Sequence, residues 1–168
     1  MTRWIALLRA VNVGGNNKIP MADLAALCGE LGFANPRTWI ASGNLLLDSD
    51  LDEAAVRGTL EAAIAARWDK PIGVLVRSGA ELAALARANP WPDRPGNRVV
   101  ALICDGDPSL DGVRGQNGEK LALAPRAIFI DYGEGMANSR LSLPASKTGT
   151  ARNMNTIAKL AALAGEGI

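Results

Sequence analysis

The sequence contains no histidine among its 168 residues. This absence excludes the Ser/His/Asp and Cys/His arrangements that activate a nucleophile, and it removes the commonest ligand of zinc. Any acid or base chemistry must therefore depend on Asp, Glu, Lys, Tyr or Cys side chains. We expect no metal site and no cofactor.

Cysteines and long apolar runs are also scarce. The two cysteines, Cys28 and Cys104, do not form a CxxC motif or another ligand spacing. We interpret both as small core residues, because Cys28 has helical spacing with neighbouring leucines and Cys104 ends the run VVALIC. No apolar run approaches the ~20 residues that span a bilayer, and Arg9 interrupts the apolar start too early for a signal peptide. We therefore expect a cytoplasmic protein without membrane association.

Aromatic residues make up only 4% of the chain, and the net charge is only +1. Few aromatics argue against a surface on which nucleic-acid bases stack, and the small net charge gives no general attraction to nucleic acid. The charge is unevenly distributed, however, because residues 1–20 and residues 137–168 each carry a net +3. These basic segments keep nucleic-acid or protein interaction as one alternative function.

Apolar residues make up 48% of the chain. Along the sequence, their spacing is typical of strands in some segments and of helices in others. Residues 3–77 predict the order strand, helix, strand, strand, helix, strand, with a tight turn near 42–44 and a helix cap at Asp50 followed by Glu53. This order is typical of the ferredoxin-like fold. We therefore expect an α+β protein whose N-terminal half is ferredoxin-like.

The second half predicts a smaller or incomplete α+β unit. Ser78 and Glu81 form a capping box for a helix that ends near Pro90, and the Pro-rich stretch NPWPDRPGN follows. Three strands are predicted at 98–104, 119–124 and 126–132, with a last helix from about Ala151 to Ala164. The predicted organisation is a ferredoxin-like subdomain at 1–78, a helix and Pro-rich connection at 79–97, and a second α+β subdomain at 98–168.

The segment RAVNVGGNNKIP, residues 9–20, is a candidate site for an anion. Gly14 and Gly15 let backbone N–H groups approach a ligand, and Lys18 supplies a mobile cation. The spacing matches neither GxxxxGK[ST] nor GxGxxG, so a simple Gly/Asn turn with a solvated lysine is the alternative. In a ferredoxin-like sheet the first and second strands run the same way. Their following loops then place these residues together: Asn12, Asn16, Asn17, Lys18, Ser42 and Asn44.

A second polar group lies in TARNMNTIAKL near the C-terminus. If this segment is helical, polar side chains share one face and apolar side chains occupy the other. The polar face would contain Arg152, Asn155, Thr156 and Lys159. The alternative interpretation is the solvated side of an ordinary amphipathic helix.

Four segments in this order, LLRAVNVGGNNKIPMADL, ELGFANPRTWIASGN, NPW and TARNMNTIAKL, give the chain a family resemblance. It resembles, over nearly its whole length, the bacterial family catalogued as domain of unknown function 1697. The resemblance implies an α+β fold of ferredoxin-like material and no established activity. Met154 stands where the family pattern usually has tryptophan. The family's recurrent segments include these residues: Arg9, Asn12, Gly14, Gly15, Asn17, Lys18, Ser42, Gly43, Asn44, Arg152, Asn153 and Thr156.

Together these patterns predict binding of a small anionic ligand, such as a nucleotide or a phosphorylated metabolite. The expected site combines the GGNNK loop, the SGN hairpin and the TARNMNT helix. A small transferase or hydrolase using the same pocket is a second hypothesis, although Asp23 is the only acid in the segments that define it. The sequence does not predict the oligomeric state.

Overall fold

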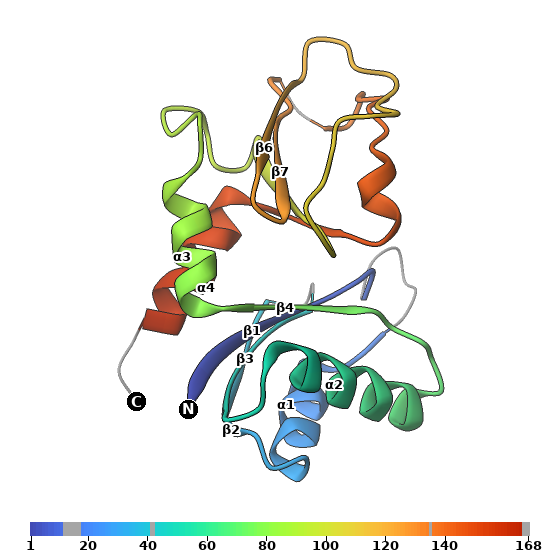
Figure 1. The fold of residues 1–168 in the computed structure, drawn as a ribbon. Coiled ribbons are helices and arrows are strands. Elements are labelled where there is room, and N and C mark those ends of the chain that lie inside the picture. The colour runs from blue at the N-terminus through green and yellow to red at the C-terminus, as the bar shows by residue number, and fades with distance from the viewer. Residues whose placement is uncertain (12–17, 41–42, 135, 166–168) are drawn as a thin grey trace. The chain divides into compact units, whose positions relative to one another are not determined.

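The computed structural model describes residues 1–11, 18–40, 43–134 and 136–165. The chain divides into two compact units, one formed by Met1–Glu81 with Leu163–Ile168 and the other by Leu82–Ala162. The described residues form a mixed α+β structure with two four-stranded antiparallel sheets and four α-helices (Figure 1). Within these residues, no helix has the length and apolar character needed to cross a membrane.

The first sheet contains β1 (Thr2–Leu8), β2 (Ala34–Trp39), β3 (Asn44–Ser49) and β4 (Val74–Ser78) in the order β2-β3-β1-β4. Helix α1 (Met21–Glu30) lies between β1 and β2 in the chain, and α2 (Glu53–Trp68) lies between β3 and β4. Both β1 and β2 pair antiparallel with β3. The two strands therefore run the same way, and the segments that follow them start at the same end of the sheet.

Local signals explain where the two helices begin and end. Helix α1 starts after Pro20, and the chain leaves it through Gly32, whose φ of +86° favours glycine. Helix α2 is capped by Asp52, whose carboxylate accepts a hydrogen bond from the Ala55 N–H at 2.8 Å. The predicted cap at Asp50 is wrong, because Asp50 precedes the helix by three residues and its carboxylate lies 3.4 Å from the N-terminal amino group.

The core of the first unit lies between these helices and one face of the sheet (Figure 1). Cys28 is fully buried there, and burial raises the pKa of its thiol to about 12. Cys104 is buried in the second unit, so the interpretation of both cysteines as core residues is confirmed. The side chains that pack the first core alternate along the strands and follow the helical stripes: Ala6, Leu8, Leu24, Leu27, Leu45, Leu47, Val56, Leu60, Ile64, Val74 and Val76.

The second sheet contains β5 (Val99–Ile103), β6 (Lys120–Ala124), β7 (Ala127–Asp131) and β8 (Thr150–Asn153) in the order β6-β7-β5-β8. Helix α3 (Gly79–Arg87) precedes it, and α4 (Met154–Gly165) follows a short 3-10 helix, η1 (Pro144–Lys147), and β8. No α-helix lies between β5 and β8 in the described residues. The second unit therefore does not repeat the element order of the first.

The predicted helix at TARNMNT needs a correction, because residues 150–153 form strand β8 and the helix begins only at Met154. The strand pairs antiparallel with β5, with Arg152 opposite Ala101 and Thr150 opposite Ile103. Asn153 then ends the strand, and its side-chain oxygen accepts a hydrogen bond from the Thr156 N–H at 2.9 Å. Arg152 therefore does not share a helical face with Thr156.

Candidate functional site

A backbone hydrogen bond joins the end of β1 to the residue that precedes β3. The Leu8 N–H donates to the carbonyl oxygen of Gly43 at 2.9 Å, which extends the antiparallel pairing of β1 with β3 by one residue pair. Gly43 has a φ of +89°, and a Cβ added there would overlap the Val11 side chain. The segment that leaves β1 is therefore packed against the turn that enters β3. Several predicted site residues lie outside the described ranges: Asn12, Gly14, Gly15, Asn16, Asn17 and Ser42.

Two cations flank this segment. The Arg9 N–H donates to the Gly73 carbonyl at 2.9 Å, and the Arg9 side chain passes 3.1 Å from the position that a Gly73 Cβ would occupy. Glycine at 73 thus leaves room for the arginine stem just before β4. Lys18 is exposed at the other end of the segment. Arg9 is held against the protein, and the Lys18 side chain is accessible from solvent.

Asn44, one of the predicted site residues, is fully buried at the start of β3. Its Nδ2 group donates to the Trp39 carbonyl oxygen at 3.1 Å, across the register pair that closes the β2–β3 end of the sheet. A buried amide that is not hydrogen-bonded is costly, so this bond stabilises the pairing of the end of β2 with the start of β3. In this structure the Asn44 side chain has a structural partner in β2.

Arg152, Asn153 and Thr156 belong to the second unit. The Arg152 side chain is buried, and its Nη1 group donates to Thr150 Oγ1 at 2.7 Å and to the Ala151 carbonyl at 3.0 Å. Burial lowers the pKa of Arg152 to about 10, so it remains a cation at neutral pH. Asn153 caps α4 through the Thr156 N–H. The side chains of Arg152 and Asn153 thus already have structural partners.

Met154, at the position where the sequence resemblance led us to expect tryptophan, is 6% exposed. Its N–H donates to the Gly96 carbonyl at 3.0 Å, which joins the start of α4 to the Pro-rich segment. A flexible thioether fills an irregular apolar space with little strain. The burial of Met154 favours its interpretation as a core filler.

A carboxylate network that sequence reasoning missed joins three strands of the first sheet. Asp48 is 3% exposed and accepts hydrogen bonds from Arg3 Nε at 2.7 Å, from Arg3 Nη2 at 2.9 Å and from Asn35 Nδ2 at 2.9 Å. The pKa of Asp48 is lowered, mainly by the hydrogen bond from Arg3. Burial acts in the opposite direction and raises the pKa, while the hydrogen bond from Asn35 lowers it further. The only feature of the sequence that points to this network is the acidic Asp48 at the end of the apolar run NLLLD.

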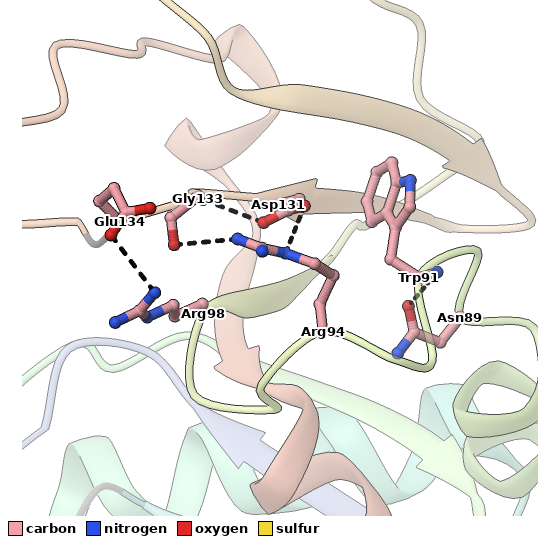
Figure 2. A network of polar contacts seen from close by, with 7 residues as sticks. All are labelled: Asn89, Trp91, Arg94, Arg98, Asp131, Gly133 and Glu134. Atoms are coloured by element: carbon pink, nitrogen blue, oxygen red, sulfur yellow. Dashed lines mark hydrogen bonds and ion pairs between the residues drawn. The ribbon is translucent and has the colours of Figure 1, made fainter.

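The Pro-rich segment is also fixed by a network, in the second unit (Figure 2). Arg94 Nε donates to Asp131 Oδ2 at 3.2 Å, and Arg94 Nη2 donates to the Gly133 carbonyl at 3.2 Å. Asp131 Oδ1 accepts a hydrogen bond from the Gly133 N–H at 2.9 Å. Because Asp131 is the last residue of β7 and is buried, Arg94 anchors this segment to the end of a central strand. Nearby, Arg98 approaches the exposed Glu134 at 3.6 Å.

The second unit also contains a polar hollow with a volume of about 490 Å³. Its wall includes Glu119, a buried carboxylate that accepts hydrogen bonds from the Ser139 hydroxyl and the Asn117 N–H. The Tyr132 ring contributes another part of the wall. Sequence reasoning did not identify this site. No group of three or more His, Cys, Asp or Glu side chains that would hold a metal ion occurs in the described parts of the chain.

Comparison with known proteins supports the fold. The conserved bacterial protein SP0830 from Streptococcus pneumoniae has a similar structure, with a TM-score of 0.77 and 23% sequence identity over 97% of this chain and 98% of that chain. No curated protein matches the chain. The model of the family described as "Protein of unknown function (DUF1697)" matches residues 1–129, which confirms the resemblance noted from the sequence. The chain therefore belongs to the DUF1697 family.

Proposed function

We propose that the chain binds a small anionic ligand, such as a nucleotide or a phosphorylated metabolite, at the loop end of the first sheet. The observation that carries the proposal is the hydrogen bond from Leu8 to Gly43. It joins the end of β1, directly before the Gly- and Asn-rich segment, to Gly43 of the SGN sequence. Two donor-rich segments that are distant in sequence thus begin at one place on the fold.

The charges around this place support an anionic ligand. Arg9 and Lys18 bracket the segment, and residues 1–20 contain no acid. Guanidinium and ammonium groups form charge-assisted hydrogen bonds to phosphate and carboxylate oxygens. In our proposal Lys18 neutralises ligand charge, Asn12, Asn17 and Ser42 orient it, and the backbone at Gly14 and Gly15 approaches it closely.

Two finer assignments belong to the same proposal. We assign the first unit to the ferredoxin-like fold on the basis of its element order and its sheet order β2-β3-β1-β4. The contribution of Arg152, Asn153 and Thr156 to the anion site stays a prediction, because these residues belong to the second unit.

The test measures the thermal unfolding of the whole chain with inorganic pyrophosphate, AMP or succinate. A ligand present at 100 times its dissociation constant stabilises the folded state by about 2.7 kcal/mol, which corresponds to several degrees for a chain of this size. We expect at least one probe to raise the melting temperature, and we expect Lys18→Ala to weaken binding about tenfold or more.

Lys120→Ala is the matched control, because Lys120 is also an exposed lysine but lies on β6 of the second unit. It removes the same charge and should leave the affinity unchanged. If none of the three probes stabilises the chain, or if both lysine variants weaken binding equally, the proposed site is wrong.

A further inference from the structure

The polar hollow in the second unit is built where two loop segments are held side by side. Arg114 and Ser142 exchange backbone hydrogen bonds, with N···O distances of 3.0 and 2.8 Å. Gly115 follows with a φ of +71°, and a Cβ there would overlap the Arg140 backbone carbonyl. Only glycine allows this close approach. The segment at 115–119 is therefore fixed against the segment at 138–140, and the hollow lies at this junction.

Glu119 supplies the carboxylate of this hollow. Its side chain accepts hydrogen bonds from the Ser139 hydroxyl and the Asn117 N–H, and its backbone carbonyl accepts one from Gln116 Nε2 at 2.7 Å. The Ser139 bond is the main cause that lowers the pKa of Glu119, so the carboxylate is ionised at neutral pH. Glu119 is only 7% exposed, yet within the described residues it forms no ion pair. Within the described residues, therefore, no cation pairs directly with the fixed negative charge in the hollow.

The remaining wall offers polar groups with free bonding capacity. Burial, and secondarily the Glu119 charge, raise the pKa of Tyr132, which keeps its phenol neutral. The described residues provide no hydrogen-bond partner for the Tyr132 hydroxyl or the Asn138 amide, and both residues line the hollow. Arg140 lines it as well. A ligand there would meet one carboxylate, one phenol, amides and a guanidinium group.

We propose that this hollow binds a small molecule that carries a primary ammonium group, and that the ammonium pairs with Glu119. An opposite charge at hydrogen-bond distance favours the ionised form of a carboxylate. The volume of about 490 Å³ falls within the usual range for small-molecule sites. An ammonium group fits better than a divalent metal, because Glu119 is the single carboxylate of the hollow and metals of the calcium and magnesium type need several oxygen ligands. The Arg140 charge disfavours polycations, so the ligand carries one amine.

The ammonium chemistry has two possible sources, amino sugars and amino acids, and the test separates them. Glucosamine, L-serine and glucose are titrated into the ¹⁵N-labelled chain, and backbone amide shifts are followed by NMR. We expect glucosamine or serine to shift the amides of Gly115, Asn117 and Ser139, whereas glucose, which lacks the ammonium, leaves them unchanged. Binding of serine would assign Arg140 to the ligand carboxylate, and binding of glucosamine would assign the polar wall to hydroxyl groups.

Variants test whether Glu119 carries the binding. Glu119→Gln removes the charge but keeps one acceptor oxygen for the Asn117 N–H, and its amide NH2 group can donate to the Ser139 hydroxyl oxygen. We expect the affinity for the amine to fall at least about tenfold. Glu134→Gln is the matched control, because Glu134 is exposed and contacts Arg98 at 3.6 Å. Tyr132→Phe removes only the phenol hydroxyl and should weaken binding several-fold. This variant provides the test if Glu119→Gln fails to fold.

Two outcomes would contradict the amine-binding proposal. If neither amine binds at tens of millimolar, or if glucose binds as tightly as glucosamine, the proposal is wrong. Glu119 would then serve only to hold the 115–119 segment to Ser139. This result would leave the anion proposal untouched, because that site involves the first unit and ligands of opposite charge.

Discussion

The backbone N–H of Leu8 donates to the carbonyl oxygen of Gly43 at 2.9 Å, joining the last residue of β1 to the residue before β3. This bond extends the antiparallel pairing of β1 with β3, in which Leu7 lies opposite Asn44. It also depends on glycine at 43, whose positive φ and missing Cβ admit the Val11 side chain. The geometry of the proposed anion site therefore depends on one small residue.

Gly43→Ala should destabilise the chain strongly. The left-handed conformation costs a non-glycine residue roughly 1–2 kcal/mol, and forcing a methyl group against Val11 and Leu8 adds about 1–3 kcal/mol. Urea denaturation measures the loss in free energy of unfolding. Gly32→Ala is the control, because Gly32 has a similar φ of +86° and open space around it. An equal loss in both variants would show that the Gly43 turn relaxes without cost.

The Arg3–Asp48–Asn35 network predicts a dependence of stability on acid. Because the pKa of Asp48 is lowered in the folded chain, its contribution is complete above the ordinary value of about 3.9 and is lost as the pH falls through the lower folded pKa. Asp48→Asn should cost about 1.5–3 kcal/mol near neutral pH, since it removes the charge from hydrogen bonds to a charged group. The variant should also lose less stability than the native chain on acidification.

Denaturation curves recorded between about pH 5 and about pH 2 check this prediction. Asp50→Asn is the control, because the Asp50 side chain is 86% exposed and, among the described residues, pairs only with the N-terminal amino group at 3.4 Å. Exposed pairs of this kind contribute little to stability. Parallel acid curves for the native chain and Asp48→Asn would contradict the role of Asp48.

Local patterns predicted most elements correctly where neighbouring residues determine them. Pro20 and Gly32 bracket α1, and the Glu81 N–H donates to Ser78 Oγ at 3.1 Å, as the predicted capping box requires. Apolar runs located β1 and β5 because their side chains are buried on both faces of the sheets. These signals depend on a few adjacent residues, so they can be detected without knowledge of the fold.

The missed features depend on contacts between distant residues. Strand β8 has only four residues, and its pairing with β5 joins segments about fifty positions apart. Arg3 and Asp48 are separated by 45 positions, and Ser139 lies 20 positions beyond Glu119. Periodicity carries no information about such pairs. Asn153 did carry a local signal, because asparagine is a favoured helix cap, and it would have placed the helix start at Met154.

The networks around the Pro-rich segment predict that Arg94 contributes more to stability than the nearby Arg98 (Figure 2). Arg94→Ala should cost about 1.5–3 kcal/mol, because it removes charged hydrogen bonds to the buried Asp131 and to Gly133. Arg98→Ala should cost less than about 1 kcal/mol, because its partner Glu134 is almost fully exposed. Urea denaturation gives both values, and hydrogen exchange of the Gly133 amide should accelerate only in Arg94→Ala. Similar losses in the two variants would show that Asp131 does not anchor the segment.

Asn153 allows a structural role to be separated from a binding role. Its side chain accepts the Thr156 N–H at 2.9 Å, so Asn153→Ala should cost about 0.5–2 kcal/mol in the free energy of unfolding. Asn153→Asp keeps a good cap and adds a negative charge at the helix N-terminus, so its stability should match or exceed that of the native chain. If Asn153 also contacts an anionic ligand, the added charge weakens binding of pyrophosphate or AMP while stability is retained. Unchanged affinity in this stable variant would restrict Asn153 to helix capping and confine the anion site to the first unit.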